Sequence, residues 1–240
     1  ENNKLILNWN IIDNIYLNNL MKLLINCIKK SQRRIEILNQ SKLNNKTFDE
    51  IDEQALYEEE MEEDNLLLQL ALIIAELIKI YKDNFIPILN NNINILKELL
   101  KYKSPNNKSN NASFVHKTIV YVLCDIYEQC SPNNTVLYLK DILPLMINIM
   151  GNNNDPRCLQ AIYYCIGSII FTCKDVINSN NILYSFNIIK SIIQYSIQEL
   201  KKSSKGYIND YENMDSYELG KLDNVMSMMY KILKYINWDA

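Results

Sequence analysis

Glycine and proline are scarce in this chain of 240 residues, which contains 4 glycines and 5 prolines. A turn-rich β fold needs a turn signal about every 10 residues, so this scarcity argues against a β-sandwich or β-barrel. The glycines also lie far apart, and the chain therefore has no glycine-rich phosphate-binding loop. The composition favours helices.

Long apolar runs are missing as well. The longest candidate, Leu66 to Ile78, is interrupted by Gln69 and Glu76, whereas a membrane span needs about 20 apolar residues. The chain begins at Glu1 within polar sequence, and no charged segment followed by an apolar one opens it. We therefore expect a segment of a longer protein, without a signal peptide and without insertion into a membrane.

The sequence also lacks sets of residues that are typical of catalytic or metal-binding sites. The chain has 1 histidine, His116, which we expect at the surface, and a catalytic triad or histidine-based zinc site would need further partners. Carboxylate pairs such as Glu58 and Glu62 lie in a charged run, without the apolar surroundings that would separate their pKa values. We therefore expect no enzyme activity, no bound metal and no cofactor.

The 6 cysteines form no CxxC pair and fall within apolar helical runs. Without a secretory signal, this pattern indicates a reduced cytosolic or nuclear setting rather than a disulfide framework. We expect these side chains to act as small buried hydrophobes. They are Cys27, Cys124, Cys130, Cys158, Cys165 and Cys173.

Charge is unevenly placed, although the net charge is only -3. Residues 49–64 form an acidic insert with ten carboxylates and no lysine or arginine, and a basic stretch from Lys29 to Arg34 precedes it. The insert is interpreted as a solvated helix or loop, or alternatively as a surface that attracts basic partners. The near-neutral balance argues against a nucleic-acid-binding surface.

Two prolines, Pro87 and Pro144, sit in similar apolar runs, each between long amphipathic stretches. Because proline is tolerated mainly in the first turn of a helix, we expect both to start helices. Asp64 is expected to cap a helix that begins near Leu66, and Asp155-Pro156 has the order of a cap followed by a first-turn proline.

The resulting order of helices predicts an all-α protein, an α-solenoid of about four HEAT-like antiparallel helix pairs in which no unit buries its apolar face alone. We expect residues 1–240 to form a single array. Its approximate units are 10–82, 85–130, 135–173 and 180–238, close to the period of about 40–47 residues in HEAT and armadillo repeats. Ile126 is expected in the core of the central pair.

Four stretches of sequence, spaced along nearly the whole chain, carry a resemblance to a known family. They are Phe48-Asp49-Glu50-Ile51-Asp52-Glu53-Gln54 with the acidic residues that follow, Tyr81-Lys82 with Phe85-Ile86-Pro87, Asp125-Ile126-Tyr127-Glu128-Gln129-Cys130-Ser131-Pro132 with Leu143-Pro144-Leu145-Met146, and Asp223-Asn224 with Lys231-Ile232-Leu233-Lys234-Tyr235. In these stretches the chain resembles the C-terminal HEAT-repeat region of importin-β-type karyopherins, most closely the karyopherin β3 kind of nuclear import receptor.

The resemblance implies a segment that binds cargo proteins with basic localisation signals and carries them through the nuclear pore under control of the Ran GTPase. It further implies nucleoporins as partners, Ran contacts mainly outside this segment, and shuttling between cytoplasm and nucleus. Two positions depart from the family pattern: Leu159 stands where the family usually has the arginine of an inter-repeat Asp–Arg ladder, and Asn94 replaces a second proline.

In the resembled family the second helix of each pair lines the concave surface, which here implies residues 64–82, 113–130, 156–173 and 218–237. The candidate partner-binding residues on these helices are Asp125, Glu128, Gln160, Tyr164 and Asn224. Their acidic and amide groups suit lysine and arginine side chains of a cargo peptide, although they equally suit contact with water or capping of a neighbour. A HEAT-repeat scaffold subunit of another assembly is the alternative function, ahead of an enzyme domain.

Overall fold

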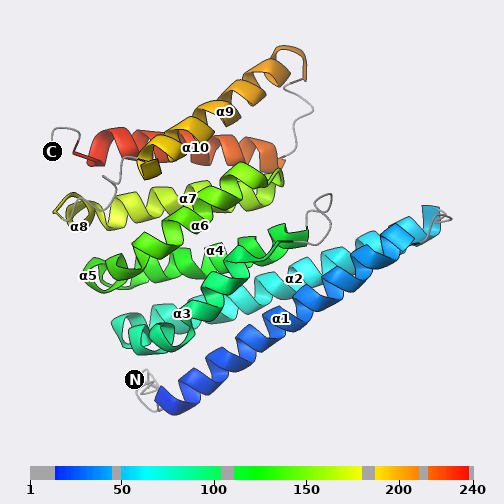
Figure 1. Ribbon diagram of the computed structural model, residues 1–240, viewed down its shortest axis with the longest axis horizontal. Coiled ribbons are helices and arrows are strands. Elements are labelled where there is room, and N and C mark those ends of the chain that lie inside the picture. The colour runs from blue at the N-terminus through cyan, green and yellow to red at the C-terminus, as the bar shows by residue number, and fades with distance from the viewer. Residues whose placement is uncertain (1–13, 45–49, 104–110, 180–186, 211–215, 238–240) are drawn as a thin grey trace, which may run out of the picture.

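The computed structural model describes residues 14–44, 50–103, 111–179, 187–210 and 216–237 (Figure 1). In these ranges every regular element is helical, and no strand occurs. The long helices fall into two layers. The first layer contains α1 (Asn14–Asn44), α3 (Ile86–Lys101), α6 (Leu139–Asn152) and α9 (Asn187–Asp210), and the second contains α2 (Glu50–Tyr81), α4 (Asn111–Gln129), α7 (Pro156–Thr172) and α10 (Ser216–Tyr235).

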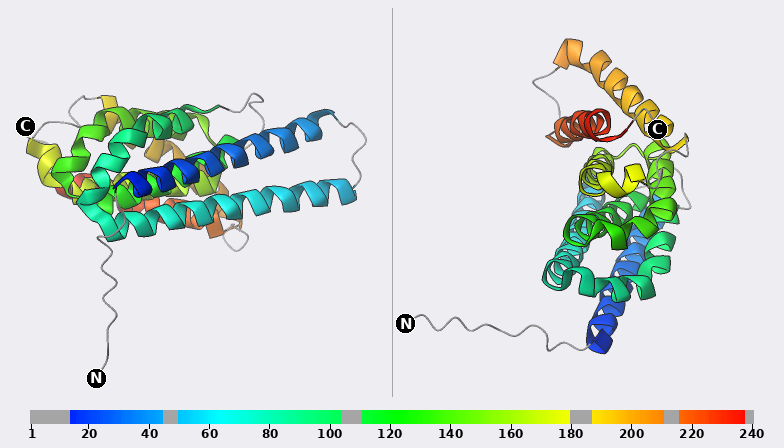
Figure 2. Two further views of the ribbon diagram at one scale, coloured as in Figure 1. Left: turned by 90° about the horizontal axis from the view of Figure 1, so that it is seen from below. Right: turned by 90° about the vertical axis from the view of Figure 1, so that its left-hand side faces the viewer.

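Within each layer, every helix packs on the next helix of the same layer. In the first layer α1 packs on α3, α3 on α6 and α6 on α9, and in the second layer α2 packs on α4, α4 on α7 and α7 on α10. In the right-hand view of Figure 2 the second-layer helices are stacked in one column and seen nearly end-on, and the first-layer helices run obliquely beside them. Helices of one pair run in opposite directions and are joined by short connections (Figure 1). This architecture is an all-α solenoid of HEAT-like helix pairs, so the predicted fold class is confirmed.

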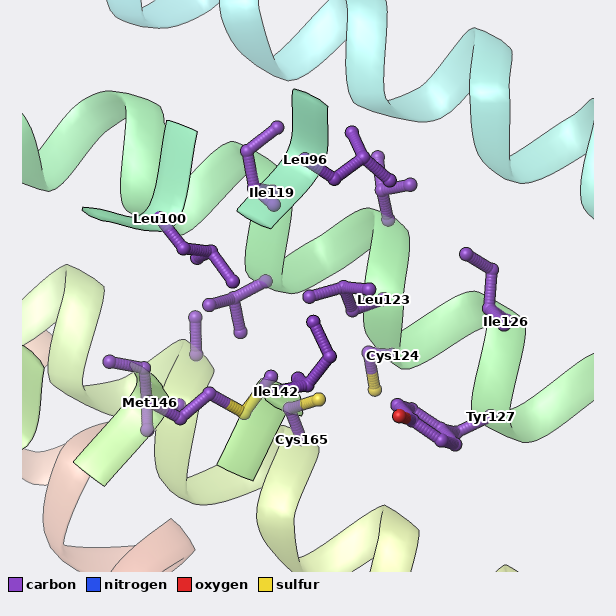
Figure 3. Packing of buried hydrophobic residues seen from close by; sticks show 14 of the residues in the cluster. Leu96, Leu100, Ile119, Leu123, Cys124, Ile126, Tyr127, Ile142, Met146 and Cys165 are labelled. Carbon is purple, nitrogen blue, oxygen red and sulfur yellow. The ribbon is translucent and has the colours of Figure 1, made fainter. Parts of the chain in front are cut away.

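The apolar interior is continuous from pair to pair. Figure 3 shows its centre, where Leu96 and Leu100 of α3 meet Ile119 and Leu123 of α4 and the side chain of Ile142 from α6. Each of these residues is at most 1% exposed, as is the predicted core residue Ile126. Because each helix buries residues against neighbours in both layers, no pair has a closed core of its own.

The cysteines bear out the prediction of small buried residues, except that Cys27 is only partly buried. All six are free thiols. The side chains of Cys124 on α4 and Cys165 on α7 point toward one another in Figure 3. The hydrogen bond with Cys165 and burial raise the pKa of the Cys124 thiol far above its usual range, which keeps it protonated.

Only one of the two proline predictions is correct. Pro87 lies in the first turn of α3, directly after a 3₁₀ helix over Lys82–Phe85. Pro144 instead lies inside α6, which begins at Leu139 after the short helix α5 (Pro132–Thr135) and a 3₁₀ turn over Val136–Tyr138. The prediction that Pro144 starts a helix is therefore wrong, because the chain turns into helical geometry before it reaches the proline.

The acidic insert is helical where the structure describes it, because α2 runs without a break from Glu50 to Tyr81. The prediction that Asp64 caps a separate helix is wrong. The α1–α2 hairpin extends beyond α3 and α4 (Figure 1), and we call this part, residues 37–44 and 50–62, the overhang. No described side chain of α2 from Glu53 to Glu63 is buried, as expected for a solvated helix.

Ser31 and Arg34 of α1 fasten the base of the overhang to Glu63 of α2. The Ser31 hydroxyl donates to Glu63 Oε2 over 2.5 Å, and Arg34 Nη2 donates to the same oxygen over 2.9 Å. Burial raises the pKa of Glu63, but the hydrogen bonds from Arg34 and Ser31 outweigh it, so that the pKa is lowered. A carboxylate is thereby favoured where the two helices leave the body of the solenoid.

Two further helical segments differ from the sequence-based expectations. A short helix, α8 (Lys174–Ser179), follows α7 without having been predicted. The polar composition of residues 202–217 predicts a loose segment, whereas α9 continues to Asp210, and residues 211–215 lie outside the described part of the chain. The polar residues 103–111 predict a loop, and residues 104–110 of it lie outside the described part of the chain.

Candidate functional site

The five candidate residues all lie on helices of the second layer, at two seams between neighbouring helices. Asp125 and Glu128 of α4 meet Tyr164 of α7 at the first seam, while Gln160 of α7 meets Asn224 of α10 at the second. The structure thus brings the residues into two adjacent groups along the α7 helix.

Glu128 is the centre of the first group. Its Oε1 accepts a hydrogen bond from the Ser168 hydroxyl over 2.7 Å, and the Tyr164 hydroxyl also donates to this carboxylate. Burial, followed by the negative charge of Glu128, raises the pKa of Tyr164 to about 12. Tyr164 therefore stays a neutral donor, and its ring remains 49% exposed.

Charged residues of α2 complete this first group, which we call the acidic surface: Glu76, Lys79, Asp125, Glu128 and Tyr164. Lys79 pairs with Glu76 at 2.7 Å on the surface of α2 and lies within electrostatic range of both carboxylates of α4. Burial raises the pKa of Asp125, the Lys79 charge lowers it, and nearby Glu128 raises it further, so that the pKa is raised overall. Three carboxylates and one ammonium leave this surface negative.

The second group depends on a close approach of α10 to α7. Asn224 Nδ2 donates a hydrogen bond to the backbone carbonyl of Gln160 over 3.1 Å, so its side chain links α10 to α7. A Cβ atom placed at Gly220 would lie 2.3 Å from Gln160 Nε2, which shows how tightly the glutamine side chain packs on α10. Both residues are half-buried. These contacts give Asn224 a structural role.

A buried ionic ladder, which the sequence analysis missed, links the second-layer helices nearer their N-termini. Lys117 Nζ of α4 lies 2.7 Å and 2.8 Å from the two carboxylate oxygens of Asp64 on α2. Arg157 at the start of α7 lies 3.7 Å from Asp64 Oδ2 and 3.3 Å from Asp155 Oδ1. Its guanidinium also sits over the Phe114 ring, 5.0 Å from the centroid.

This ladder joins three successive helices, even though Leu159 replaces the arginine expected there from the family pattern. Leu159 is 2% exposed and belongs to the core, while Arg157, two residues earlier, reaches across to α2. Asp155 also accepts a hydrogen bond from the Arg157 backbone amide over 3.0 Å, which confirms the predicted cap of α7. No local sequence pattern indicates the ladder, since Asp64 and Lys117 lie 53 positions apart in the chain.

His116 is buried, so the prediction of a surface residue is wrong. It is 6% exposed, and its Nε2 lies 3.0 Å from the Tyr102 carbonyl oxygen, while Nδ1 has no hydrogen-bond partner among the described residues. Burial lowers its pKa to about 4 despite the opposing effect of the Tyr102 carbonyl. The imidazole is therefore neutral near neutral pH, and it acts as a core residue.

The described ranges contain no group of three or more histidine, cysteine, aspartate or glutamate side chains arranged to hold a metal ion. Likewise, none of the helices in these ranges is long and apolar enough to cross a membrane.

Comparison with known proteins gives a match to a family model over part of the chain. No curated protein matches the chain. Residues 5–102, however, match the family model of importin repeat 6. This range includes α1, the overhang, the rest of α2 and α3, and ends one residue after α3. Over residues 5–102 the chain is similar to importin repeat 6, a repeat of nuclear transport receptors.

Proposed function

We propose that this chain is part of the C-terminal region of a nuclear import receptor of the karyopherin β3 kind, and that its second helix layer binds cargo. The similarity of residues 5–102 to importin repeat 6 supports the receptor class. The four stretches that resemble karyopherin β3 support the finer placement, and they extend beyond the matched range. In this proposal the receptor shuttles between cytoplasm and nucleus, meets nucleoporins in the pore, and releases cargo under control of Ran.

The acidic surface is the observation that carries the cargo-binding role. It places the carboxylates of Asp125 and Glu128 beside Tyr164, and that of Glu76 near Asp125, on three successive helices. Lysine and arginine side chains of a basic localisation signal would pair with these carboxylates, and the half-exposed ring would cover the aliphatic stems. Carboxylates of the overhang add long-range attraction for the same kind of partner.

Binding of a fluorescent, lysine-rich localisation peptide to the 240-residue chain tests this role. Replacing both α4 carboxylates, as Asp125→Asn with Glu128→Gln, is expected to weaken binding about three- to tenfold, because surface ion pairs each contribute about 0.2–1 kcal/mol. The matched control is Glu98→Gln with Asp175→Asn, which removes the same charge from exposed positions of α3 and α8, outside the second helix layer. If both double variants weaken binding equally, net charge explains the effect, and this outcome contradicts the binding role of the acidic surface.

Control by Ran is tested on the full-length receptor, because the resemblance assigns most Ran contacts to other repeats. We expect Ran loaded with GTP, but not with GDP, to be captured and to displace a basic cargo. A full-length protein that captures neither form, or both equally, favours the alternative of a HEAT-repeat scaffold subunit in another assembly.

A further inference from the structure

A second surface of different chemistry lies where α7, α8 and α10 meet. We call it the lysine–aromatic surface: Phe171, Lys174, Tyr230, Lys234 and Tyr235. The Phe171 and Tyr235 rings pack edge to face, with centroids 5.5 Å apart and planes at 62°. This pair ties the end of α7 to the end of α10, and it forms a platform that both lysines cover.

Both lysine ammonium groups lie close to aromatic rings, and the Lys234 ammonium also donates hydrogen bonds to the hydroxyls of Tyr230 and Tyr235. Lys174 Nζ lies 5.5 Å from the Phe171 centroid and 5.1 Å from the Tyr235 centroid. Lys234 Nζ lies 5.3 Å from the Tyr230 centroid and 5.2 Å from the Tyr235 centroid. The Tyr235 ring is thus shared by two cations, which brings their positive charges to one place.

Neither of these ammonium groups forms an ion pair with a carboxylate among the residues that the structure describes. The lysines of the ionic ladder and of the acidic surface, by contrast, are each paired with aspartate or glutamate. Phe171 and Tyr230 also keep 48% and 59% of their surfaces exposed. The surface therefore combines two available cations with apolar area that water still covers.

From this combination we infer that the lysine–aromatic surface binds an acidic peptide segment of a partner protein, one that carries an aromatic or large aliphatic side chain among its carboxylates. The carboxylates pair with Lys174 and Lys234, and the apolar side chain packs on the exposed rings of Phe171 and Tyr230. Because the rings already position both ammonium groups, binding orders fewer side chains than at free surface lysines. This role goes beyond cargo binding, since the partner has the opposite charge.

Single-stranded nucleic acid is the competing occupant, because its bases stack on aromatic rings and its phosphates attract lysines. One feature of the surface favours the peptide. The surface offers two cations, whereas nucleic-acid affinity depends on many phosphate contacts.

The test measures fluorescence anisotropy of a labelled glutamate-rich peptide with a central phenylalanine, titrated with the 240-residue chain. Lys174→Gln with Lys234→Gln is expected to weaken binding about fivefold, a loss expected when two surface ion pairs are removed. The control, Lys22→Gln with Lys140→Gln, removes the same charge from exposed positions of α1 and α6 and leaves binding unchanged. Thermal unfolding followed by circular dichroism verifies that both variants are folded.

Three further probes complete the test. Phe171→Leu is expected to weaken binding of the peptide that contains phenylalanine, but not binding of a version with alanine in its place. A peptide with lysine instead of glutamate is expected not to respond to the Lys174 and Lys234 substitutions. The inference is overturned if the glutamate peptide binds the Lys174/Lys234 variant as tightly as the parent, or if an oligothymidine strand binds the parent more tightly than the peptide does.

Discussion

Asp64 and Lys117 form a two-oxygen ion pair between α2 and α4, with side chains only 12% and 10% exposed. Charges in such a position are costly to separate, because the partner left behind stays buried without compensation. The pair stands at the centre of the ionic ladder, since Arg157 of α7 also approaches Asp64. It is therefore the first place where the solenoid is expected to be sensitive to a single substitution.

Lys117→Met is expected to lower the free energy of unfolding by about 3 kcal/mol, because it leaves the Asp64 carboxylate buried with only the more distant Arg157. Adding Asp64→Leu in the same chain is expected to restore most of the loss, since a buried ion pair is often replaced by apolar residues at little cost. Urea unfolding measures both variants. A double variant as unstable as Lys117→Met alone would contradict the ion pair as the cause.

His116 is expected to make the stability depend on pH between about 6.5 and 4. Its pKa is lowered from 6.5 to about 4 by burial, so the unfolded chain binds a proton in this range while the folded chain does not. Stability therefore falls as the pH falls through this range, by about 2 kcal/mol between about pH 7 and pH 5. Because His116 is the single histidine, His116→Gln is expected to flatten most of this slope in urea titrations.

The two prolines are expected to respond differently to replacement by alanine. Pro144→Ala introduces an amide that can bond to the carbonyl of Lys140 within α6, so the free energy of unfolding is expected to rise by about 1–2 kcal/mol. Pro87→Ala, in the first turn of α3, recovers no such bond and is expected to be neutral or slightly destabilising. Thermal unfolding of the two variants side by side measures the difference, and equal shifts would argue against it.

Ile126→Asp is expected to destabilise the centre of the solenoid by more than about 4 kcal/mol, because it buries an unpaired charge at a position that is 1% exposed. Leu137→Asp, at a position that is 74% exposed, is the matched control and is expected to change stability by less than about 0.5 kcal/mol. Equal melting temperatures of the Ile126 variant and the parent would contradict the assigned core face.

Local patterns in the sequence were sufficient to predict much of the fold. The order Asp155-Pro156 predicts the start of α7 because a cap and a first-turn proline act within one helical turn. The apolar spacing around Ile126 likewise predicts a buried helix face. Pro144 was misplaced because its helix begins at Leu139, under the influence of the short helical turns that precede it.

Residues whose environment depends on distant partners could not be assigned in this way. Asp64 was interpreted as a cap, although its partner Lys117 lies 53 positions further along the chain. His116 was placed at the surface because nothing nearby in the sequence indicates the carbonyl of Tyr102 beside it. The grouping of Glu128 with Tyr164 and Ser168 similarly depends on how α4 stacks on α7, which requires the three-dimensional structure.

The overhang has a consequence for the order in which the molecule opens. Its helical turns lie against one neighbouring helix rather than several, and they end at the contacts of Ser31 and Arg34 with Glu63. Backbone amides of the overhang are therefore expected to exchange with deuterium well before those of α4 and α7. Unfolding would then begin in the overhang and proceed toward the body of the solenoid, while the stacked helices of the interior remain folded.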